Sequence, residues 1–528
     1  GSNGQFLSKQ SGNTGGLTWA DVSAAPEITG TVASGASLAA NDAVLINPTD
    51  GTLKKVEAVA EATGTVGEHI TNYFFGYPSK TAYDAATGKI VHAFADYPNY
   101  HAKVMVGTVS GTSITWGSAV NIGGGSGEEA TGLSLAFHPP TGKIVFANKR
   151  QVGHSSGSAG QGFACVGTIS GTTITFGSWV NFSLGNLIQE PDMCYDAKLD
   201  KMAIVYRSDD SNKTGYATTG TVASSGNTIT FSSSGGNVFA GGTNRVRYPR
   251  VIYNPDTEAI IINWPAENDS NNGYIKSTVP GVLDSQGDYT YGSSYALSAG
   301  NGLNSFRVTY DTKRKRIVGI GSVSGQCRLM LGSVSGHVIT VESSNAGTIF
   351  SNNHTLCDIK YDVKSGKCLC IAGQSQGLDI ATVEVNADDT ITQGSVTELQ
   401  SGDDRVDINL PYGSNTDGTL GSSDGKYVIT WHDYEGSGWT SNGAKHAVKQ
   451  MASTTLDADQ FIGFSAGSYS ASATATVKVN FNTVTGLSGL SPTKTYYVQS
   501  NGTLGLTAVT PSVVAGKAIN SSTLLIKN

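Results

Sequence analysis

The sequence predicts an all-β protein whose main part is a seven-bladed β-propeller with four-stranded blades. Three observations lead to this prediction. The composition disfavours helices, a short motif recurs along the middle of the chain, and a hairpin-like motif recurs between its copies. A sheet that repeats in this way cannot bury both of its faces alone, whereas sheets packed around an axis bury each other's faces.

The composition is typical of a chain rich in strands and turns. Of 528 residues, 67 are Gly, and only 14% are charged. Ser, Thr and Asn are abundant, and these residues favour turns, caps and strands over helix interiors. Because 38% of the residues are hydrophobic, the chain can bury a core, which excludes a disordered linker.

Several classes of partner are disfavoured by the same composition. The net charge is −7 and no basic stripe is present, so nucleic acid is not expected as a partner. No apolar run is long enough to cross a membrane, and we expect no membrane insertion. The six cysteines lie in strand-like apolar runs without zinc-ligand spacing. We therefore expect them to be small buried side chains, with no metal and no cofactor.

The first repeated motif begins with an aromatic residue, which is usually followed by Asp or Asn. A few turn residues that often end in Gly-Lys come next, and a β-branched run completes the motif. The aromatic positions of its six full copies are Tyr83, Phe137, Tyr195, Tyr253, Tyr310 and Tyr361. A shorter seventh copy surrounds Asp424. Successive aromatics are 54, 58, 58, 57 and 51 residues apart, and this spacing predicts repeated sheets of similar size.

The second repeated motif predicts a hairpin in each unit. It reads VGTVSGTSITW from Val106 and VGTISGTTITF from Val166, with related copies from Gly220 and Leu331. Gly supplies the positive φ that a tight turn needs, and alternating Thr and Ile suit a pleated strand. Two hairpins per unit give four strands, so residues 60–452 are predicted to form the propeller.

The remaining segments are predicted to form a smaller β-domain. Residues 453–528 supply most of it, and residues 27–59 are expected both to pair with it and to close the propeller. Gly51 to Ala62 is the stretch expected to complete the last blade, which lacks a clear fourth strand. Residues 1–26 are expected to be a fibre-like oligomerisation segment.

Both ends of the chain resemble phage virion proteins. The start has the pattern G-x-x-G-Q-x-L…L-x-W of phage tail-fibre proteins, carried by Gly1, Gly4, Gln5, Leu7, Leu17 and Trp19. The region from Gln460 resembles a β-domain of fibre and adhesion proteins of marine phages, and the middle resembles propellers found with it. The resemblance implies a virion appendage, a homotrimer formed through the N-terminal segment, contacts with other virion proteins and a role in host attachment. The absence of a Met at the start fits a piece of a longer fibre.

Long, varied segments between the second and third strands are the candidate binding loops, because loops on a rigid scaffold commonly carry ligand-binding residues. Exposed aromatic rings beside polar groups suit sugars. The predicted ligand-binding residues are Tyr97, Tyr100, Trp264, Trp431, Tyr434, Trp439, Arg247, Arg307 and Arg405. The alternative is that the Trp and Tyr side chains only cover the ends of the blades.

A further set of charged residues precedes the motif aromatics and is expected to lie toward the propeller axis: Glu128, Glu129, Glu190, Arg245, Arg247, Arg250, Arg307, Asp403, Asp404 and Arg405. These residues form either a ring that binds a ligand or a set of structural ion pairs. The sequence leaves both interpretations open.

Motifs of enzymes are weak in this chain. Two G-x-S-x-G matches lack the strand-to-helix elbow, and there is no HExxH motif. We therefore expect no enzyme activity, and the resemblance to phage fibre proteins implies a virion appendage whose propeller binds a host cell-surface receptor, a glycan or a protein. The alternatives are a virion enzyme that cleaves glycans with two converging carboxylates, and a purely structural spike or capsid decoration.

Overall fold

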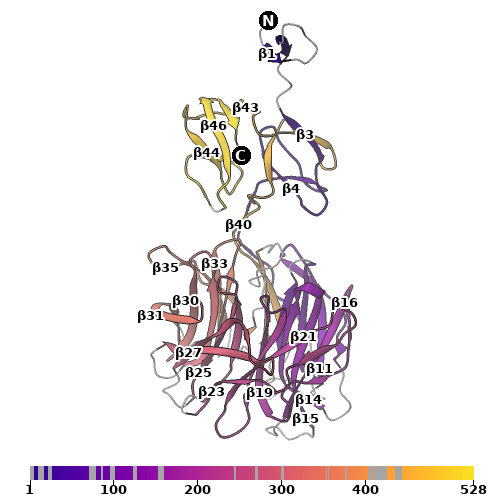
Figure 1. The fold of residues 1–528 in the computed structure, drawn as a ribbon, viewed down its shortest axis with the longest axis vertical. Coiled ribbons are helices and arrows are strands. Elements are labelled where there is room, and N and C mark those ends of the chain that lie inside the picture. The colour runs from indigo at the N-terminus through magenta and orange to yellow at the C-terminus, as the bar shows by residue number, and fades with distance from the viewer. Residues whose placement is uncertain are drawn as a thin grey trace. The chain divides into compact units, whose positions relative to one another are not determined.

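The structure is a computed structural model. It describes residues 5–9, 17–21, 26–70, 79–84, 87–95, 101–122, 128–152, 160–242, 245–267, 272–298, 303–351, 354, 356–374, 377–401, 408–409, 425–433, 443–509 and 511–527. Among these residues the regular elements are β-strands and one short 3-10 turn, η1 (Pro139–Thr141), which confirms the all-β prediction. The chain divides into unit 1 (Gly1–Glu61 and Ala452–Asn528) and unit 2 (Ala62–Met451) (Figure 1).

Unit 2 consists of consecutive groups of antiparallel strands, each named here by its first strand. The β9 group contains β9 (Lys80–Asp84), β10 (Lys89–Ala95), β11 (Ala102–Ser110), β12 (Ser113–Trp116) and β13 (Val120–Asn121), and the β14 group contains β14 (Glu128–His138), β15 (Lys143–Val152), β16 (Gly160–Ser170), β17 (Thr173–Phe176) and β18 (Val180–Asn181). The β19 group contains β19 (Leu187–Asp196), β20 (Lys201–Ser208), β21 (Gly215–Val222), β22 (Ile229–Phe231) and β23 (Asn237–Ala240), the β24 group contains β24 (Arg250–Asn254), β25 (Ala259–Pro265), β26 (Gly273–Leu283) and β27 (Tyr289–Ser298), and the β28 group contains β28 (Leu303–Asp311), β29 (Arg316–Val323), β30 (Gln326–Ser335) and β31 (Val338–Phe350). The β32 group contains β32 (Leu356–Asp362), β33 (Lys367–Gln374), β34 (Gly377–Val385), β35 (Ile391–Gln393) and β36 (Thr397–Ser401), and the β37 group contains β37 (Ile408–Asn409), β38 (Lys426–Asp433) and β39 (Gly443–Gln450) together with β7 (Ala62–Thr63) and β8 (Gly67–Ile70). A short pairing of β16 with β19 joins the β14 and β19 groups.

The repeated aromatic-Asp motif forms the turn between the first two strands of a group. Asp196 Oδ1 accepts hydrogen bonds from the backbone N–H groups of Lys198 and Leu199 at 3.0 and 3.2 Å. In the β28 group, Asp311 Oδ1 accepts one from Arg314 N at 2.9 Å. A side chain that bonds to the backbone two or three residues ahead stabilises a turn. This explains why Asp follows the aromatic residue in most copies.

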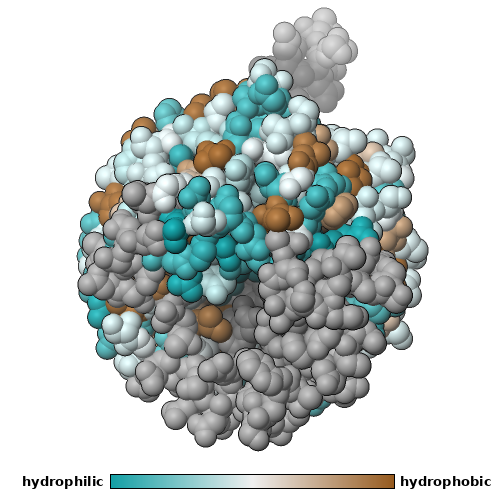
Figure 2. Space-filling model, turned by 90° about the horizontal axis from the view of Figure 1, so that it is seen from below, coloured by the Kyte–Doolittle hydropathy of each residue, from teal (hydrophilic) through white to brown (hydrophobic). Residues whose placement is uncertain are grey.

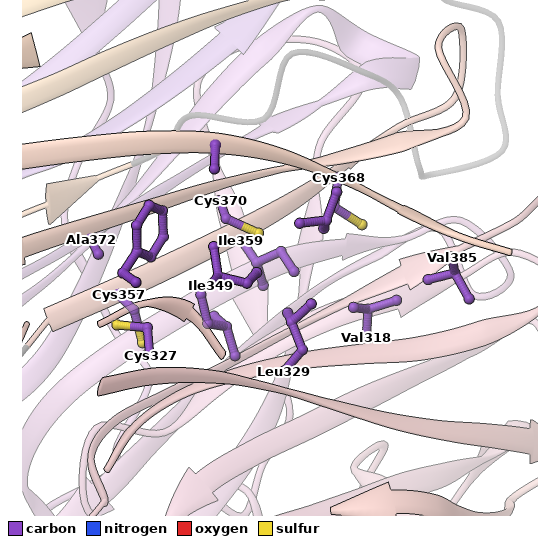
Figure 3. Close-up of a cluster of buried hydrophobic side chains, with 14 of the residues drawn as sticks. Val318, Cys327, Leu329, Ile349, Cys357, Ile359, Cys368, Cys370, Ala372 and Val385 are labelled. Atoms are coloured by element: carbon purple, nitrogen blue, oxygen red, sulfur yellow. The ribbon is translucent and has the colours of Figure 1, made fainter. Parts of the chain in front are cut away.

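Each strand group shares a hydrophobic core with the next group along the chain. The cluster between the β28 and β32 groups contains Leu329, Ile359 and the thiols of Cys327 and Cys370 (Figure 3). Five of the six cysteines are fully buried, and all six are free thiols. The expectation that they act as small apolar side chains is therefore consistent with their burial.

The packing between groups continues around to the start of unit 2. Tyr83 and Ile90 of the β9 group lie in one cluster with Val428 and Val448 of the β37 group. The first strand of each group also contacts the first strand of the following group. The groups thus pack on each other in a cycle, which is the arrangement of a β-propeller.

Small residues allow neighbouring groups to approach closely. A Cβ atom on Gly177, directly after β17, would overlap the backbone oxygen of Asn227 in the next group. The same relationship joins Gly117 to Thr172, and Gly64 to Thr112. The Gly that follows each of these strands is therefore a packing requirement between groups.

The strand that completes the β37 group lies later in the chain than expected. Lys449 of β39 pairs with Thr63 of β7, and His446 pairs with Gly67 of β8. The expected closing segment, 51–62, instead places Leu53 in the core of unit 1, where it is 1% exposed. The prediction of a strand from the N-terminal side is right, but its range is wrong because β5 (Leu53–Lys55) pairs with β4 (Ala43–Ile46).

Unit 1 contains two five-stranded antiparallel sheets. The first has the order β3 (Glu27–Thr31), β42 (Thr474–Lys478), β41 (Phe461–Ser465), β4, β5, so it combines strands from the two ends of the chain. The second has the order β43 (Thr483–Thr485), β47 (Thr523–Ile526), β46 (Val514–Asn520), β44 (Thr495–Val498), β45 (Leu504–Gly505). Two short pairs, β1 (Gln5–Lys9) with β2 (Leu17–Asp21) and β6 (Ala58–Val59) with β40 (Ser453–Thr454), complete it.

Candidate functional site: a ring of polar residues on the first strands

The β-ladders place one residue of each first strand at an equivalent position. In every group this residue pairs with the fifth residue of the second strand of the same group. The pairs are Lys80–Ala93, Ser134–Ala147, Asp192–Val205, Arg250–Asn263, Arg307–Ile320, Asp358–Ile371 and Asn409–Thr430. We call the first members of these pairs the inner ring.

The inner ring is polar at every position, although the strands that carry it are largely buried. Its neighbours along the strands include Val251 and Val308, which are 5% and 3% exposed. The side chains of Lys80 and Asp192 are 17% and 14% exposed to solvent. Polar groups at such positions need partners, because an unpaired buried charge is costly.

Asp192 is the carboxylate that connects three other first strands. Its Oδ1 lies 3.7 Å from Nζ of Lys80 and accepts a hydrogen bond from Ser134 Oγ at 3.4 Å. Its Oδ2 accepts one from the backbone N–H of Val251 at 3.1 Å. Burial raises the pKa of Asp192, but Lys80, Arg250 and Lys360 together with the Val251 N–H outweigh burial and hold the pKa below its usual range.

The positive charges of the two ring arginines, Arg250 and Arg307, are less well compensated by carboxylates than that of Lys80. Arg250 Nη1 donates to the carbonyl of Pro249 at 3.0 Å, and Arg307 Nη1 donates to the carbonyl of Phe306 at 2.9 Å. Within the described part of the chain, neither guanidinium has a carboxylate oxygen within 4.0 Å.

The cations of the ring also affect each other's pKa values. Burial lowers the pKa of Lys80 to about 8, and Arg250 and Arg307 act in the same direction, against Asp192 and Asp358. Burial and the neighbouring Arg250 likewise lower the pKa of Arg307 to about 10. Both shifts mean that the surroundings favour loss of positive charge.

A second group of charges lies just before β24. We call it the Glu190 cluster: Glu190, Arg207, Lys213, Arg247, Tyr248 and Glu267. Arg207 binds Glu190 through Nε at 2.9 Å and Nη2 at 3.3 Å, and the N–H of Tyr248 donates to Glu190 Oε2 at 2.7 Å. Lys213 forms an ion pair with Glu267. The hydrogen bond from Lys213, with the charges of Lys213, Arg247 and Arg207, lowers the pKa of Glu267 against the opposing effect of burial.

Two residues of the Glu190 cluster have left-handed backbone conformations. Glu190 has φ +54° and Tyr248 has φ +41°, and both precede their ring residues, Asp192 and Arg250, by two positions. The guanidinium of Arg247 lies 5.3 Å from the centre of the Tyr248 ring, which is 37% exposed. Non-glycine residues in this conformation cost free energy and often occur at functional sites. Figure 2 shows hydrophilic residues gathered near the centre of one face of the molecule.

The structure corrects the expected exposure of two aromatic residues. Trp264 and Trp431 are both 0% exposed. Trp264 packs between Phe239 and Tyr274 at ring distances of 5.2 and 5.8 Å. The indole N–H of Trp431 donates to Gln400. Each lies on a second strand of its group rather than in a loop, so its ring belongs to the core between groups and cannot stack on a ligand at the surface.

The other predicted site residues divide into two sets. Arg307 lies in the inner ring and Arg247 lies in the Glu190 cluster, as described above. Tyr97, Tyr100, Tyr434, Trp439 and Arg405 lie outside the described residues. The predicted roles of these residues in binding stay predictions.

The axial charges also divide into two kinds. Glu190 forms the structural ion pair with Arg207, whereas Arg250 and Arg307 have no such partner among the described residues. Lys80, Asp192 and Asp358 were not predicted from the sequence as site residues. The signal was present, because each lies three residues before the motif aromatic, as Arg250 and Arg307 do.

The described residues contain no group of three or more His, Cys, Asp or Glu side chains placed to hold a metal ion. No helix in the described part of the chain has the length and apolar character needed to cross a bilayer.

Comparisons with known proteins identify no family. No family model matches the chain, and no curated protein matches it. Among solved structures, similar ones include a putative 6-phosphogluconolactonase from Bacteroides fragilis, with 13% identity, coverage of 72% of this chain and 98% of that chain, and a TM-score of 0.43. The NanB sialidase from Streptococcus pneumoniae has 12% identity, coverage of 73% and 69%, and a TM-score of 0.41. The Dos1 propeller has 9% identity, coverage of 74% and 95%, and a TM-score of 0.39. These values carry no argument about function.

Proposed function

We propose that the protein is a virion appendage of the tail-fibre type whose propeller binds a host cell-surface receptor, a glycan in the first instance. The observation that carries this proposal is the inner ring, in which polar residues from separate strand groups converge and two arginines have hydrogen-bond donors that no residue in the described ranges accepts. Convergent polar groups on a rigid scaffold are typical of a binding site.

We infer that unit 2 is a seven-bladed propeller with four-stranded blades. The repeated motif occurs in seven copies in the sequence, and an equivalent inner-ring position occurs on β9, β14, β19, β24, β28, β32 and β37. The core clusters link these groups in a cycle. A rigid ring of this kind holds the inner-ring residues in fixed positions.

The virion setting rests on the resemblance of the two ends of the chain to phage fibre proteins. In that setting residues 1–26 contribute to a homotrimer, and the other partners are further virion proteins. Three copies of a weak site raise the apparent affinity for a surface that repeats its receptor, without any new contact.

Binding is favoured over glycan cleavage by the state of Asp192. Cleavage requires a carboxylic acid with a raised pKa beside a second carboxylate. Asp192 instead accepts a backbone hydrogen bond and lies beside Lys80, and its pKa is lowered. A carboxylate held in its ionised form by these contacts suits ligand binding or structural support better than proton donation.

The test is binding of the purified full chain to an array of neutral and acidic bacterial polysaccharides. Arg250→Ala removes a cation from the inner ring, and Lys198→Ala removes a half-exposed cation in the turn after β19. We expect Arg250→Ala to weaken glycan binding several-fold and Lys198→Ala to leave it unchanged.

Three results would contradict the proposal. Absence of binding to every glycan and to intact bacteria would favour a structural spike. Release of reducing sugar from a bound polysaccharide would favour the depolymerase. Equal binding by the wild type and by a correctly folded Arg250→Ala variant would place the site elsewhere.

A further inference from the structure

The geometry points to the inner ring as a site for an anionic group of the ligand: a carboxylate, a phosphate or a sulfate. This inference rests on the proposed function, because it names the chemistry that the receptor would carry. It predicts that acidic polysaccharides, rather than neutral ones, are the preferred ligands.

The balance of charge in the inner ring favours an anion. The ring carries three cations, Lys80, Arg250 and Arg307, and two carboxylates, Asp192 and Asp358, and these groups act on one another. The ring residues thus have a surplus of positive charge. Concentrating cations in a place with little water is unfavourable unless an anion joins them.

The two arginines have hydrogen-bond donors that no described residue accepts. Each guanidinium has five N–H groups in a planar fork. In Arg250 and Arg307 the structure records one protein acceptor each, the carbonyl of the preceding residue, within the described part of the chain. Both arginines are partly exposed, and none of their nitrogen atoms is among the buried atoms without a partner in the described part of the chain. A fork of this kind binds carboxylate or phosphate through two parallel hydrogen bonds.

Structural ion pairs do not account for the ring arginines. If they did, each ring cation would have its own carboxylate. Asp192, however, is already shared among Lys80, Ser134 and the Val251 N–H, and neither arginine has a carboxylate oxygen within 4.0 Å among the described residues. The Glu190 cluster shows what a satisfied pair looks like in this chain, because Arg207 and Glu190 are joined by two hydrogen bonds.

The charge of Lys80 gives the site a pH dependence. Since the pKa of Lys80 is about 8 in the free protein, an anion that binds beside it favours the protonated amine. Binding at pH 8 should therefore take up a fraction of a proton, and affinity should fall as pH rises above 8. Affinity should also fall with added salt, because the attraction is between charges.

The experiment is calorimetric titration of the full chain with three anionic probes and one neutral probe: glucuronate, inorganic phosphate, inorganic sulfate and glucose. We expect binding of at least one anion and none of glucose. Arg307→Gln should weaken anion binding about tenfold or more, because it removes a charged donor pair, and Arg307→Lys should retain part of it. Arg316→Gln is the matched control, since Arg316 lies in the same strand group and is paired with Glu342 and Asp389.

Two further readouts do not depend on one variant. The bound anion should raise the unfolding temperature of the wild type, and Lys80→Met should abolish the proton uptake at pH 8. Arg250→Gln provides a second test if Arg307→Gln fails to fold. Equal affinity in the wild type and both folded Arg→Gln variants would overturn the inference, and so would absence of binding by all three anions at millimolar concentrations.

Failure of this inference and failure of the proposed function give different results. If neutral polysaccharides bind on the array and none of the three anions binds, the anion site is wrong and the receptor-binding function stands. If an anion binds at the ring and no polysaccharide or cell surface is bound, the anion site stands and the receptor-binding function is wrong.

Discussion

The ammonium of Lys80 lies 3.7 Å from Oδ1 of Asp192, although a whole strand group separates their strands, β9 and β19, in the chain. The intervening group contributes Ser134, whose hydroxyl also bonds to Asp192. A small residue at that position allows the longer side chains on either side to meet. Asp192 therefore ties together strands from different groups, and this relationship makes it the most informative residue of the ring.

Asp192→Asn should destabilise unit 2. The substitution keeps the size of the side chain but leaves Lys80, Arg250 and Arg307 with less compensation. We expect a loss of about 3 kcal/mol in the free energy of unfolding, as for removal of one partner from a buried ion pair. Urea unfolding followed by tryptophan fluorescence measures it. Glu398→Gln, at an exposed carboxylate of the same unit, should change stability by less than about 0.5 kcal/mol; a similar cost for both variants would contradict the role of Asp192.

The stability of unit 2 should fall between pH 6.5 and pH 4. Burial lowers the pKa of His446 to about 4, whereas its usual value is about 6.5. The unfolded chain therefore binds a proton in this range that the folded chain does not, so the stability is complete above about pH 6.5 and is lost as pH falls. The loss amounts to about 3 kcal/mol at most. Burial lowers the pKa of His138 as well and acts in the same direction.

His446→Gln should flatten this pH dependence of the urea midpoint, because it removes the titrating ring beside Trp116, whose ring centre is 5.8 Å away. His337→Gln is the matched control, since His337 is exposed in the same unit. An unchanged slope in His446→Gln would mean that other groups cause the pH dependence.

Gly177→Ala should destabilise unit 2 although it adds only a methyl group. The new Cβ would overlap the backbone oxygen of Asn227 in the neighbouring strand group, and backbone cannot move aside without disturbing the packing between groups. We expect a cost of about 1–3 kcal/mol, measured from the midpoint of urea unfolding. At Gly241 a new Cβ would have its nearest neighbour 3.4 Å away, so Gly241→Ala should be nearly neutral; equal effects would show that the groups can separate at this point.

Trp264 should contribute to stability rather than to ligand contact. Trp264→Ala leaves a large cavity between Phe239 and Tyr274 and should cost about 3–5 kcal/mol. Trp264→Phe should cost much less, because the indole nitrogen has no hydrogen-bond partner among the described residues. Glycan binding by the folded Trp264→Phe variant should equal that of the wild type; a selective loss of binding at unchanged stability would restore Trp264 to the site.

The sequence was sufficient for the local features of the fold. The Asp after most of the motif aromatics predicts a turn because a carboxylate bonds to nearby backbone N–H groups, as Asp311 does with Arg314. Gly and alternating Thr and Ile predict the hairpins because these preferences act over a few residues. The repetition predicts sheets that pack on one another, since each repeated sheet needs neighbours to bury its two faces.

The tertiary structure decided which residues meet. Trp264 looks like a loop aromatic in the sequence, and only the packing of Phe239 and Tyr274 shows that it is buried. Leu53 fits a closing strand by its pattern, but the core of unit 1 takes it, and β7 and β8 pair with β39 instead. Lys80 and Asp192 are 112 positions apart, and no local preference relates them. Their meeting depends on the shared register of separate sheets, because long-range electrostatic contacts form only where the packing of the whole ring brings the strands together.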